Sequence, residues 1–308
     1  MKLELKNIKK VFGKKTALNN INFTAKSGHA FGLLGRNGAG KTTTIRILMN
    51  VFKASGGEIL LDGKPLDYKA VSFGYLPEER GLYPKEKILD QLIYLATLKG
   101  MSKKDAITSV NYWLDFLNMS EHKNKPLDTL SKGNQQKIQL ISSIAHDPDI
   151  VVFDEPFSGL DPVNARLLES VVKEQIKQNK IVIFSSHQMN YIEEFCDDIL
   201  IMKNGEIMIS GNIKQIKQSY ERNKLKIESK DVQKIKAEYE NECQLIDDTD
   251  LIYKMVSADQ KQKIMQKLIK EYDIDSIGIL EPTLNDIFVE YAGDEKEIDE
   301  ITNIKEKR

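Results

Sequence analysis

The chain has 308 residues, a length that suits one large domain and a smaller one. With 41% hydrophobic residues, 30% charged residues and a net charge of −1, it has a globular composition and no overall field that attracts nucleic acid. The two cysteines, Cys196 and Cys243, lie far apart, which excludes a disulfide framework and a cysteine zinc site and favours a reducing cytosol.

Neither a targeting segment nor a membrane span is expected. Residues 1–5 lack the apolar stretch of a signal peptide. No apolar run approaches the roughly 18–20 residues that cross a bilayer. If the protein works at a membrane, we expect it to do so through a partner.

The N-terminal part predicts two kinds of structure. Residues 1–25 alternate apolar and polar side chains and predict an antiparallel sheet, with a turn at Phe12-Gly13. Residues 29–34 form a continuous apolar run, which indicates a short buried strand, and residues 43–49 begin a helix. The segment that joins this strand to this helix is the most informative one in the chain.

That segment reads Gly35-Arg36-Asn37-Gly38-Ala39-Gly40-Lys41-Thr42-Thr43 and fits the phosphate-loop pattern G-x-x-x-x-G-K-[ST]. Its glycines let backbone N–H groups wrap closely around a triphosphate. Lys41 can reach the β- and γ-phosphates, and Thr42 offers a hydroxyl to Mg²⁺. A chance glycine-rich turn is the alternative, but strand, loop and helix N-terminus is the geometry that binds phosphate.

Further along, the pattern changes twice. Asp62-Gly63 indicates a hairpin, and residues 73–76 indicate another buried strand. From about residue 85 to 118 the apolar period is helical, broken at 99–102, and Trp113 falls on the core stripe rather than in a ligand-stacking position. We interpret residues of about 79–130 as a helical insert.

From residue 130 to 211 an α/β pattern returns. Residues 150–153 and 181–184 are continuous apolar runs of the kind found in covered parallel strands, with a helix over about 162–178 between them. Asn204-Gly205 indicates a hairpin turn. Beyond residue 212, short strands and helices predict a small α/β domain. These are strands over 223–228, 251–256 and 275–280 and helices over 231–241, 258–271 and 283–291.

Two further motifs carry charge or polar groups at element ends. The strand at 150–153 ends in Asp154 and Glu155, which suit an Mg²⁺ shell and an attacking water respectively, although two solvated acids are the alternative. Ser131 and Gly133 precede an apolar helix and suit a second anion site, whereas helix capping by Ser131 is the simpler interpretation.

Taken together these motifs resemble a known family. The phosphate loop, Leu130-Ser131-Lys132-Gly133, the strand ending in Asp154-Glu155, the segment 158–161 and His187 follow one another in the order found in the ATP-binding subunit of an ABC (ATP-binding cassette) transporter. The resemblance covers about residues 1–212. It implies an α/β fold: a P-loop NTPase with a mixed sheet core, an antiparallel β subdomain and the helical insert. A small α/β accessory domain over 213–292 and a charged tail over 293–308 would follow.

The resemblance implies a role for each matched residue. Phe12 would stack on adenine, with a core position as the alternative. The phosphate-binding residues would be Gly35, Asn37, Gly38, Gly40, Lys41, Thr42 and Thr43. The Mg²⁺ side would consist of Thr42, Asp154 and Glu78.

The remaining roles concern catalysis and pairing. Glu155 would be the catalytic carboxylate, and His187 would contact the γ-phosphate rather than merely cap a helix. Ser131 and Gly133 would bind the γ-phosphate of ATP held by the other subunit, and Asp161 would bridge the two subunits.

The chain departs from the family pattern at three positions. Glu78 replaces the usual glutamine, and Lys132 and Asn134 replace a glycine and a glutamine of the signature. We expect Lys132 to point to solvent. The segments 75–83 and 281–288 resemble bacterial exporters of the sodium-efflux and drug- or peptide-resistance subgroup.

The sequence therefore predicts an ATPase that uses ATP and Mg²⁺ to drive export. Its expected partners are a second copy or a homologous ATP-binding subunit and an integral membrane permease, with no nucleic acid. Its expected location is cytoplasmic and peripheral, on the inner face of the cell membrane. An ABC-type ATPase outside transport and a nucleotide-gated regulatory module are the alternatives.

Overall fold

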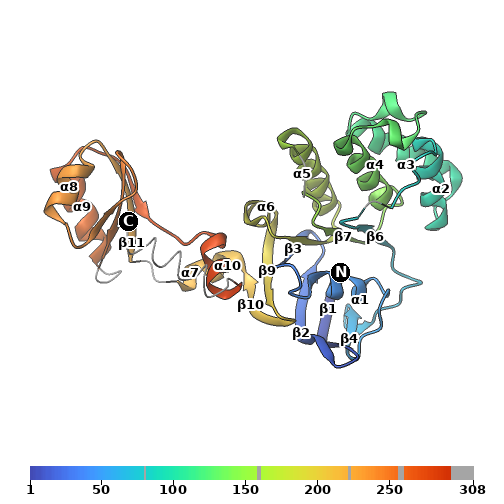
Figure 1. The fold of residues 1–308 in the computed structure, drawn as a ribbon, viewed down its shortest axis with the longest axis horizontal. Helices are drawn as coiled ribbons and strands as arrows, with labels where there is room; N and C mark the ends of the chain where they lie inside the picture. The colour runs from blue at the N-terminus through green and yellow to red at the C-terminus, as the bar shows by residue number, and fades with distance from the viewer. Residues whose placement is uncertain (80, 158–160, 221–222, 256–259, 293–308) are drawn as a thin grey trace. The chain divides into compact units, whose positions relative to one another are not determined.

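A computed structural model describes residues 1–79, 81–157, 161–220, 223–255 and 260–292 (Figure 1). The chain divides into two compact units, Met1–Gly211 and Asn212–Arg308, which are described separately. Three predictions fall outside the described residues. They concern the charged tail over 293–308, residues 158–160 of the segment 158–161, and the start of a helix at residue 258.

An antiparallel sheet opens the first unit. Its strands are β1 (Lys2–Phe12), β2 (Lys15–Lys26), β4 (Gly56–Leu61) and β5 (Lys64–Pro65), in the order β2-β1-β4-β5. Alternating residues of β1 point inward, so that Leu3, Leu5 and Ile8 are fully buried. The predicted hairpin at Asp62-Gly63 is confirmed, because β4 and β5 pair across two residues with positive φ.

A six-stranded sheet forms the centre of this unit. Its strands are β3 (His29–Gly35), β6 (Phe73–Leu76), β7 (Ile150–Asp154), β8 (Ile181–Ser186), β9 (Cys196–Lys203) and β10 (Glu206–Asn212), in the order β10-β9-β3-β8-β7-β6. The pairs β3–β8, β3–β9, β7–β8 and β6–β7 are parallel. Every residue of β7 and β8 is buried, as their continuous apolar runs predict.

Helices cover this sheet and form the insert. They are α1 (Lys41–Leu48), α2 (Ile88–Leu98), α3 (Lys103–Phe116), α4 (Lys132–Ile144), α5 (Pro162–Lys177) and α6 (Met189–Phe195), with short 3-10 turns η1 (Ser120–His122) and η2 (Leu127–Thr129). In the insert, α2 and α3 pack against each other and against α4 (Figure 1). Ser102 caps α3 at the predicted break, and Trp113 is 4% exposed, which confirms its core position.

The second unit contains its own sheet. The strands are β11 (Lys224–Ser229), β12 (Cys243–Leu245), β13 (Asp250–Lys254) and β14 (Ile274–Ile279), in the order β12-β13-β11-β14, and the helices are α7 (Ile213–Ser219), α8 (Val232–Glu238), α9 (Lys261–Glu271) and α10 (Leu284–Ala292). Leu225 and Ile227 of β11 are buried in a separate hydrophobic core. The sequence did not predict β12 or α7. Among the described residues, no helix has the length and apolar character needed to cross a bilayer.

Candidate nucleotide site

The site forms where three parallel strands end. In the sheet, Leu34 of β3 lies opposite Ser186 of β8, and Asp154 of β7 lies opposite Ser185. Because the carboxyl ends of parallel strands share one edge, the loop after β3, the acids after β7 and His187 after β8 come together there. Segments far apart in the sequence therefore supply one site.

The turn between β9 and β10 packs against the phosphate loop. Gly205 N donates to Ala39 O at 2.9 Å, and a Cβ atom at Gly205 would lie 2.3 Å from Ala17 O. Gly40 has φ of +114°, and a Cβ atom there would lie 2.6 Å from the Leu18 side chain. Glycine is required at both positions by backbone geometry and by close packing.

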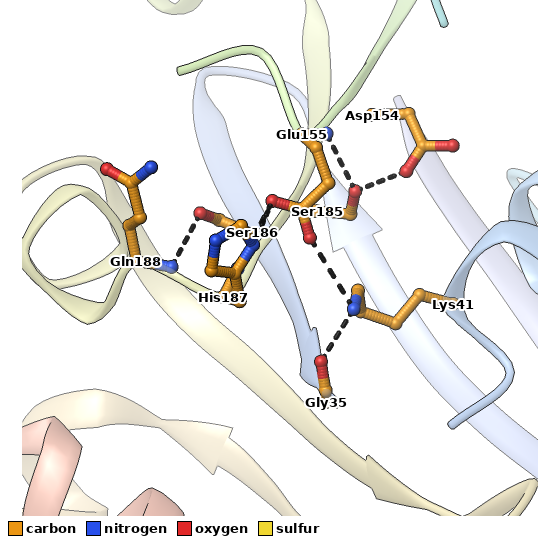
Figure 2. Close-up of polar contacts among 8 residues, drawn as sticks. All are labelled: Gly35, Lys41, Asp154, Glu155, Ser185, Ser186, His187 and Gln188. Atoms are coloured by element: carbon orange, nitrogen blue, oxygen red, sulfur yellow. Dashed lines mark hydrogen bonds and ion pairs between the residues drawn. The ribbon is translucent and has the colours of Figure 1, made fainter. Parts of the chain in front are cut away.

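Lys41 is held at the centre of the site. Its side chain is buried, and Nζ donates to Gly35 O at 2.6 Å. The same Nζ atom lies 3.5 Å from Glu155 Oε1, as Figure 2 shows. The cation of the loop and the carboxylate after β7 thus form a buried ion pair.

Glu155 is fixed by both its backbone and its side chain. Its φ of +50° is in the left-handed region, and its N–H donates to Ser185 O and to Ser185 Oγ, both at 3.1 Å. Its Oε2 atom lies 2.8 Å from His187 Nδ1 and accepts the His187 N–H at 3.3 Å (Figure 2). Backbone strain at a site of this kind is typical of residues whose orientation matters for function.

Asp154 lies deeper and is bonded on both oxygens. Ser185 Oγ donates to its Oδ1 at 2.5 Å, and the Tyr75 hydroxyl donates to its Oδ2 at 3.3 Å. Burial raises the pKa of the Asp154 carboxyl, and the hydrogen bond from Ser185 works against this rise. Burial, reinforced by the Asp154 charge, raises the pKa of Tyr75 strongly.

A pocket of about 740 Å³ opens over Lys41 and Glu155. Its lining consists of Phe12, Lys15, Thr16, Ala17, Arg36, Asn37, Gly38, Gly40, Lys41, Thr42, Thr43, Glu78, Glu155 and Asn204. Phe12 is 44% exposed, so it is not a core residue, and Lys10 Nζ lies 4.8 Å from its ring centroid. The pocket has the size of small-molecule sites in proteins.

Six predicted site residues in the described part of the chain are not part of this lining. Three of them lie next to it: Gly35 bonds to Lys41, His187 bonds to Glu155, and Asp154 shares Ser185 with Glu155.

The other three, Ser131, Gly133 and Asp161, form a separate group. Ser131 caps α4 by accepting the Asn134 N–H at 3.4 Å. A Cβ atom at Gly133 would lie 3.8 Å from Asp161 Oδ2, so these residues form a second group at the adjoining N-termini of α4 and α5.

Asp161 caps α5 in this second group. It accepts the N–H groups of Val163 at 3.0 Å and Asn164 at 2.9 Å. These hydrogen bonds, the one from Asn164 foremost, lower the pKa of the Asp161 carboxyl. Lys132 is exposed, as expected.

Sequence reasoning missed several residues that shape the site. Tyr75 and Ser185 bond Asp154; Tyr75 lies on a predicted strand and Ser185 directly follows one, and only strand register brings them to that carboxylate. Asn204 was predicted only as a turn residue, yet it lines the pocket. Other missed lining residues are Lys15, Thr16 and Ala17, whereas Arg36 lies within the predicted phosphate loop.

Comparison with known proteins decides the family. Residues 18–158 match the family model described as ABC transporter, and residues 211–292 match that of the C-terminal domain of DrrA1-3-like ATP-binding proteins. The chain is 40% identical over 293 residues to the ABC transporter ATP-binding protein YhaQ of Bacillus subtilis, covering 94% of this chain and 98% of YhaQ. The chain belongs to the ABC transporter family. It is similar to the ATP-binding subunits of that family, which bind and hydrolyse ATP.

Other ABC proteins agree with this assignment. The linearmycin resistance ATP-binding protein LnrL of Bacillus subtilis is 32% identical over 213 residues, which cover 68% of each chain. A solved ATP-binding subunit of an ABC transporter superposes with a TM-score of 0.66 at 26% identity, covering 71% of this chain and 92% of that one. A dimeric ABC cassette, MJ0796, shares the fold with a TM-score of 0.61 at 24% identity, covering 68% of this chain and 98% of that one. The predicted P-loop NTPase fold is thereby confirmed.

Proposed function

We propose that this chain powers export as one of two ATP-binding subunits that close face to face on two ATP molecules. The observation that carries the proposal is the separation of the matched residues into two groups. Lys41 and Glu155 face the 740 Å³ pocket, whereas Ser131, Gly133 and Asp161 lie outside it. Each complete site then combines the pocket of one copy with Ser131 and Gly133 of another, which makes pairing a condition of turnover.

In and beside the pocket, the hydrolytic roles follow from chemistry and position. Glu155 Oε1 is buried and, within the described residues, receives no hydrogen bond, so it can accept one from an attacking water. His187 holds the other oxygen of the same carboxylate and is itself exposed enough to reach a γ-phosphate. Lys41 supplies positive charge for the phosphates. Phe12 supplies an exposed aromatic face for adenine.

The residues present also fit Mg²⁺. Within the described residues, no group of three or more His, Cys, Asp and Glu side chains is placed to hold a metal ion by itself. Mg²⁺ suits such a site, because it takes one or two carboxylates together with phosphate oxygens and waters. Thr42, Asp154 and Glu78 would hold it, and it would neutralise charge on the phosphates. Asp154, oriented by Ser185 and Tyr75, would supply the best fixed carboxylate.

The proposed partners are a second copy, or a homologous ATP-binding subunit, and an integral membrane permease. The helical insert would contact the permease, so the protein would work at the cytoplasmic face of the membrane. The similarity to LnrL, whose name refers to linearmycin resistance, supports a drug as one class of exported substrate. The α/β unit over 213–292 would form an accessory domain.

Hydrolysis and pairing are tested together. Purified chain should hydrolyse ATP with Mg²⁺, and Glu155→Gln should keep ATP binding, lose turnover and accumulate as a dimer with ATP by light scattering. Glu121→Gln, an exposed glutamate of η1, is the matched control and should behave as wild type. Wild-type turnover that Glu155→Gln leaves unchanged would contradict the catalytic assignment.

The membrane partner needs a separate experiment. A permease should co-purify with the tagged chain from detergent-extracted membranes and should change its ATP turnover. Hydrolysis with no membrane protein retained would instead favour a non-transport ATPase or a nucleotide-gated regulatory module.

A further inference from the structure

Helix α4 carries a buried glutamine that reaches into the loop after β6. Gln139 is 6% exposed, and its Nε2 atom donates to Glu79 O at 2.8 Å and to Pro77 O at 3.4 Å. These two carbonyls flank Glu78, whose side chain lines the 740 Å³ pocket. Both N–H groups of one carboxamide are thus used to fix the backbone on either side of a single acid.

A second glutamine of α4 makes the same kind of bond to the other acidic loop. Gln136 Nε2 donates at 2.8 Å to Pro156 O, the carbonyl of the residue that follows Glu155. Residues three apart lie on one face of a helix, so Gln136 and Gln139 project side by side from α4. One helix face therefore holds the backbone beside Glu78 and beside Glu155.

A small cavity lies between these groups. Its volume is about 100 Å³, and its lining consists of Leu76, Pro77, Glu78, Gln136, Gln139, Glu155 and Pro156. Glu78 and Glu155 line both this cavity and the 740 Å³ pocket. Of these two spaces in the described part of the chain, Gln136 and Gln139 line the small cavity alone. The glutamines thus contact the loops that carry the two acids but do not line the 740 Å³ pocket.

We propose that Gln139, assisted by Gln136, is a positioning residue for ATP hydrolysis, acting through the backbone on either side of Glu78 and after Glu155. The proposal deepens the proposed function and rests on it. Since α4 begins beside Ser131, a shift of this helix when a second copy docks would move both acids together. The two glutamines therefore link the surface expected to face the other subunit to the segments that carry Glu78 and Glu155.

The test substitutes methionine, which keeps the length of the side chain but removes its donors. Gln139→Met would free two carbonyls, and displacement of reacting groups by about 1 Å costs on the order of 100-fold in rate. We expect kcat to fall at least about tenfold, with the KM for ATP changed less than about twofold. Turnover is expressed per ATP site, counted by equilibrium binding of ATP without Mg²⁺, so that loss of folded protein cannot imitate the effect.

Gln91 provides a matched control. It is 4% exposed on α2; its Nε2 atom donates to Tyr83 O at 3.3 Å and Glu86 O at 3.2 Å, and its Oε1 atom accepts the Tyr83 N–H at 3.2 Å. Gln91→Met removes these three bonds inside the insert, so it should lower the melting temperature at least as much as Gln139→Met but leave kcat per site within about twofold of wild type. If Gln139→Met does not fold, Gln136→Met, which loses a single bond, takes its place.

The outcomes separate the two ideas. An inactive wild-type chain would defeat the proposed function itself. An active wild type in which Gln139→Met and Gln136→Met keep full kcat per site would overturn the positioning role and leave the proposed function intact. Equal loss of kcat in Gln91→Met would also overturn it, because the effect would then be general to the insert.

Discussion

Lys41 and Glu155 form an ion pair, with Nζ of the lysine 3.5 Å from Oε1 of the glutamate. Both side chains are more than 90% buried, and Glu155 is also bonded to His187 (Figure 2). The residue expected to bind phosphate therefore directly contacts the residue expected to activate water. In a buried pair each charge offsets the desolvation of the other, so changing either residue affects both.

Lys41→Met should weaken ATP binding. Loss of the positive charge that reaches the phosphates is expected to raise the Kd for ATP at least about tenfold, since charge-assisted bonds contribute roughly 1.5–3 kcal/mol. Isothermal titration calorimetry in the absence of turnover measures the change. Lys69→Met removes an exposed lysine outside the pocket and is the control. Wild-type affinity in Lys41→Met would refute the phosphate role.

The ion pair also predicts a coupling in stability. Lys41→Met leaves the Glu155 carboxylate buried without its cation, and breaking such a pair costs about 3–5 kcal/mol. Adding Glu155→Gln removes the unpaired charge, so the double variant should regain at least about 1 kcal/mol relative to additivity. Urea unfolding of the wild type, both single variants and the double variant gives this cycle. Strict additivity would show that the contact carries no energy.

Ser185→Ala should shift the pH dependence of hydrolysis. Burial raises the pKa of Asp154 and the Ser185 hydrogen bond lowers it, so the variant should raise this pKa further. If the ionised form is the active one, the rate falls as pH falls through this pKa, and the acid limb should move to higher pH. A profile of kcat against pH measures the shift. Ser143→Ala, another buried serine, should leave the limb in place, and an unmoved limb in Ser185→Ala would contradict the argument.

The fold was predictable where local pattern and packing agree. The apolar runs of β7 and β8 indicate covered strands because both faces of these strands are buried. The turns at Asp62-Gly63 and Asn204-Gly205 follow from residues that tolerate positive φ. By contrast β12 spans three residues and pairs at the edge of its sheet, too short for a period to be detected.

The site was predictable where its residues belong to a recognisable motif and not where a residue outside any motif reaches the site through the fold. The phosphate loop is a single segment with its own glycine spacing, so its pattern can be found in the sequence. Ser185 reaches Asp154 only through the register of two parallel strands. Gln139 bonds Glu79 O from the middle of α4, and the sequence of that helix does not indicate which backbone groups its polar side chains contact. Asn204 reaches the pocket because Gly205 binds the phosphate loop.

Asp161 allows its capping role to be separated from its proposed role between subunits. Its carboxylate accepts two N–H groups at the start of α5, and these bonds lower its pKa. The stability that it contributes is therefore present above the unfolded pKa and is lost as pH falls through the folded one. Asp161→Ala should lower the melting temperature by a few degrees at pH 7 and by less at pH 3.

Asp161→Ser distinguishes the two roles, because serine caps helices nearly as well but carries no charge. We expect this variant to keep the melting temperature of the wild type and to form less of the ATP-dependent dimer when combined with Glu155→Gln, as measured by light scattering. Asp128→Ser, at an exposed aspartate of η2, should change neither quantity. A full yield of dimer from Asp161→Ser would restrict Asp161 to the capping of its own helix. The pairing of subunits would then have to rest on Ser131 and Gly133.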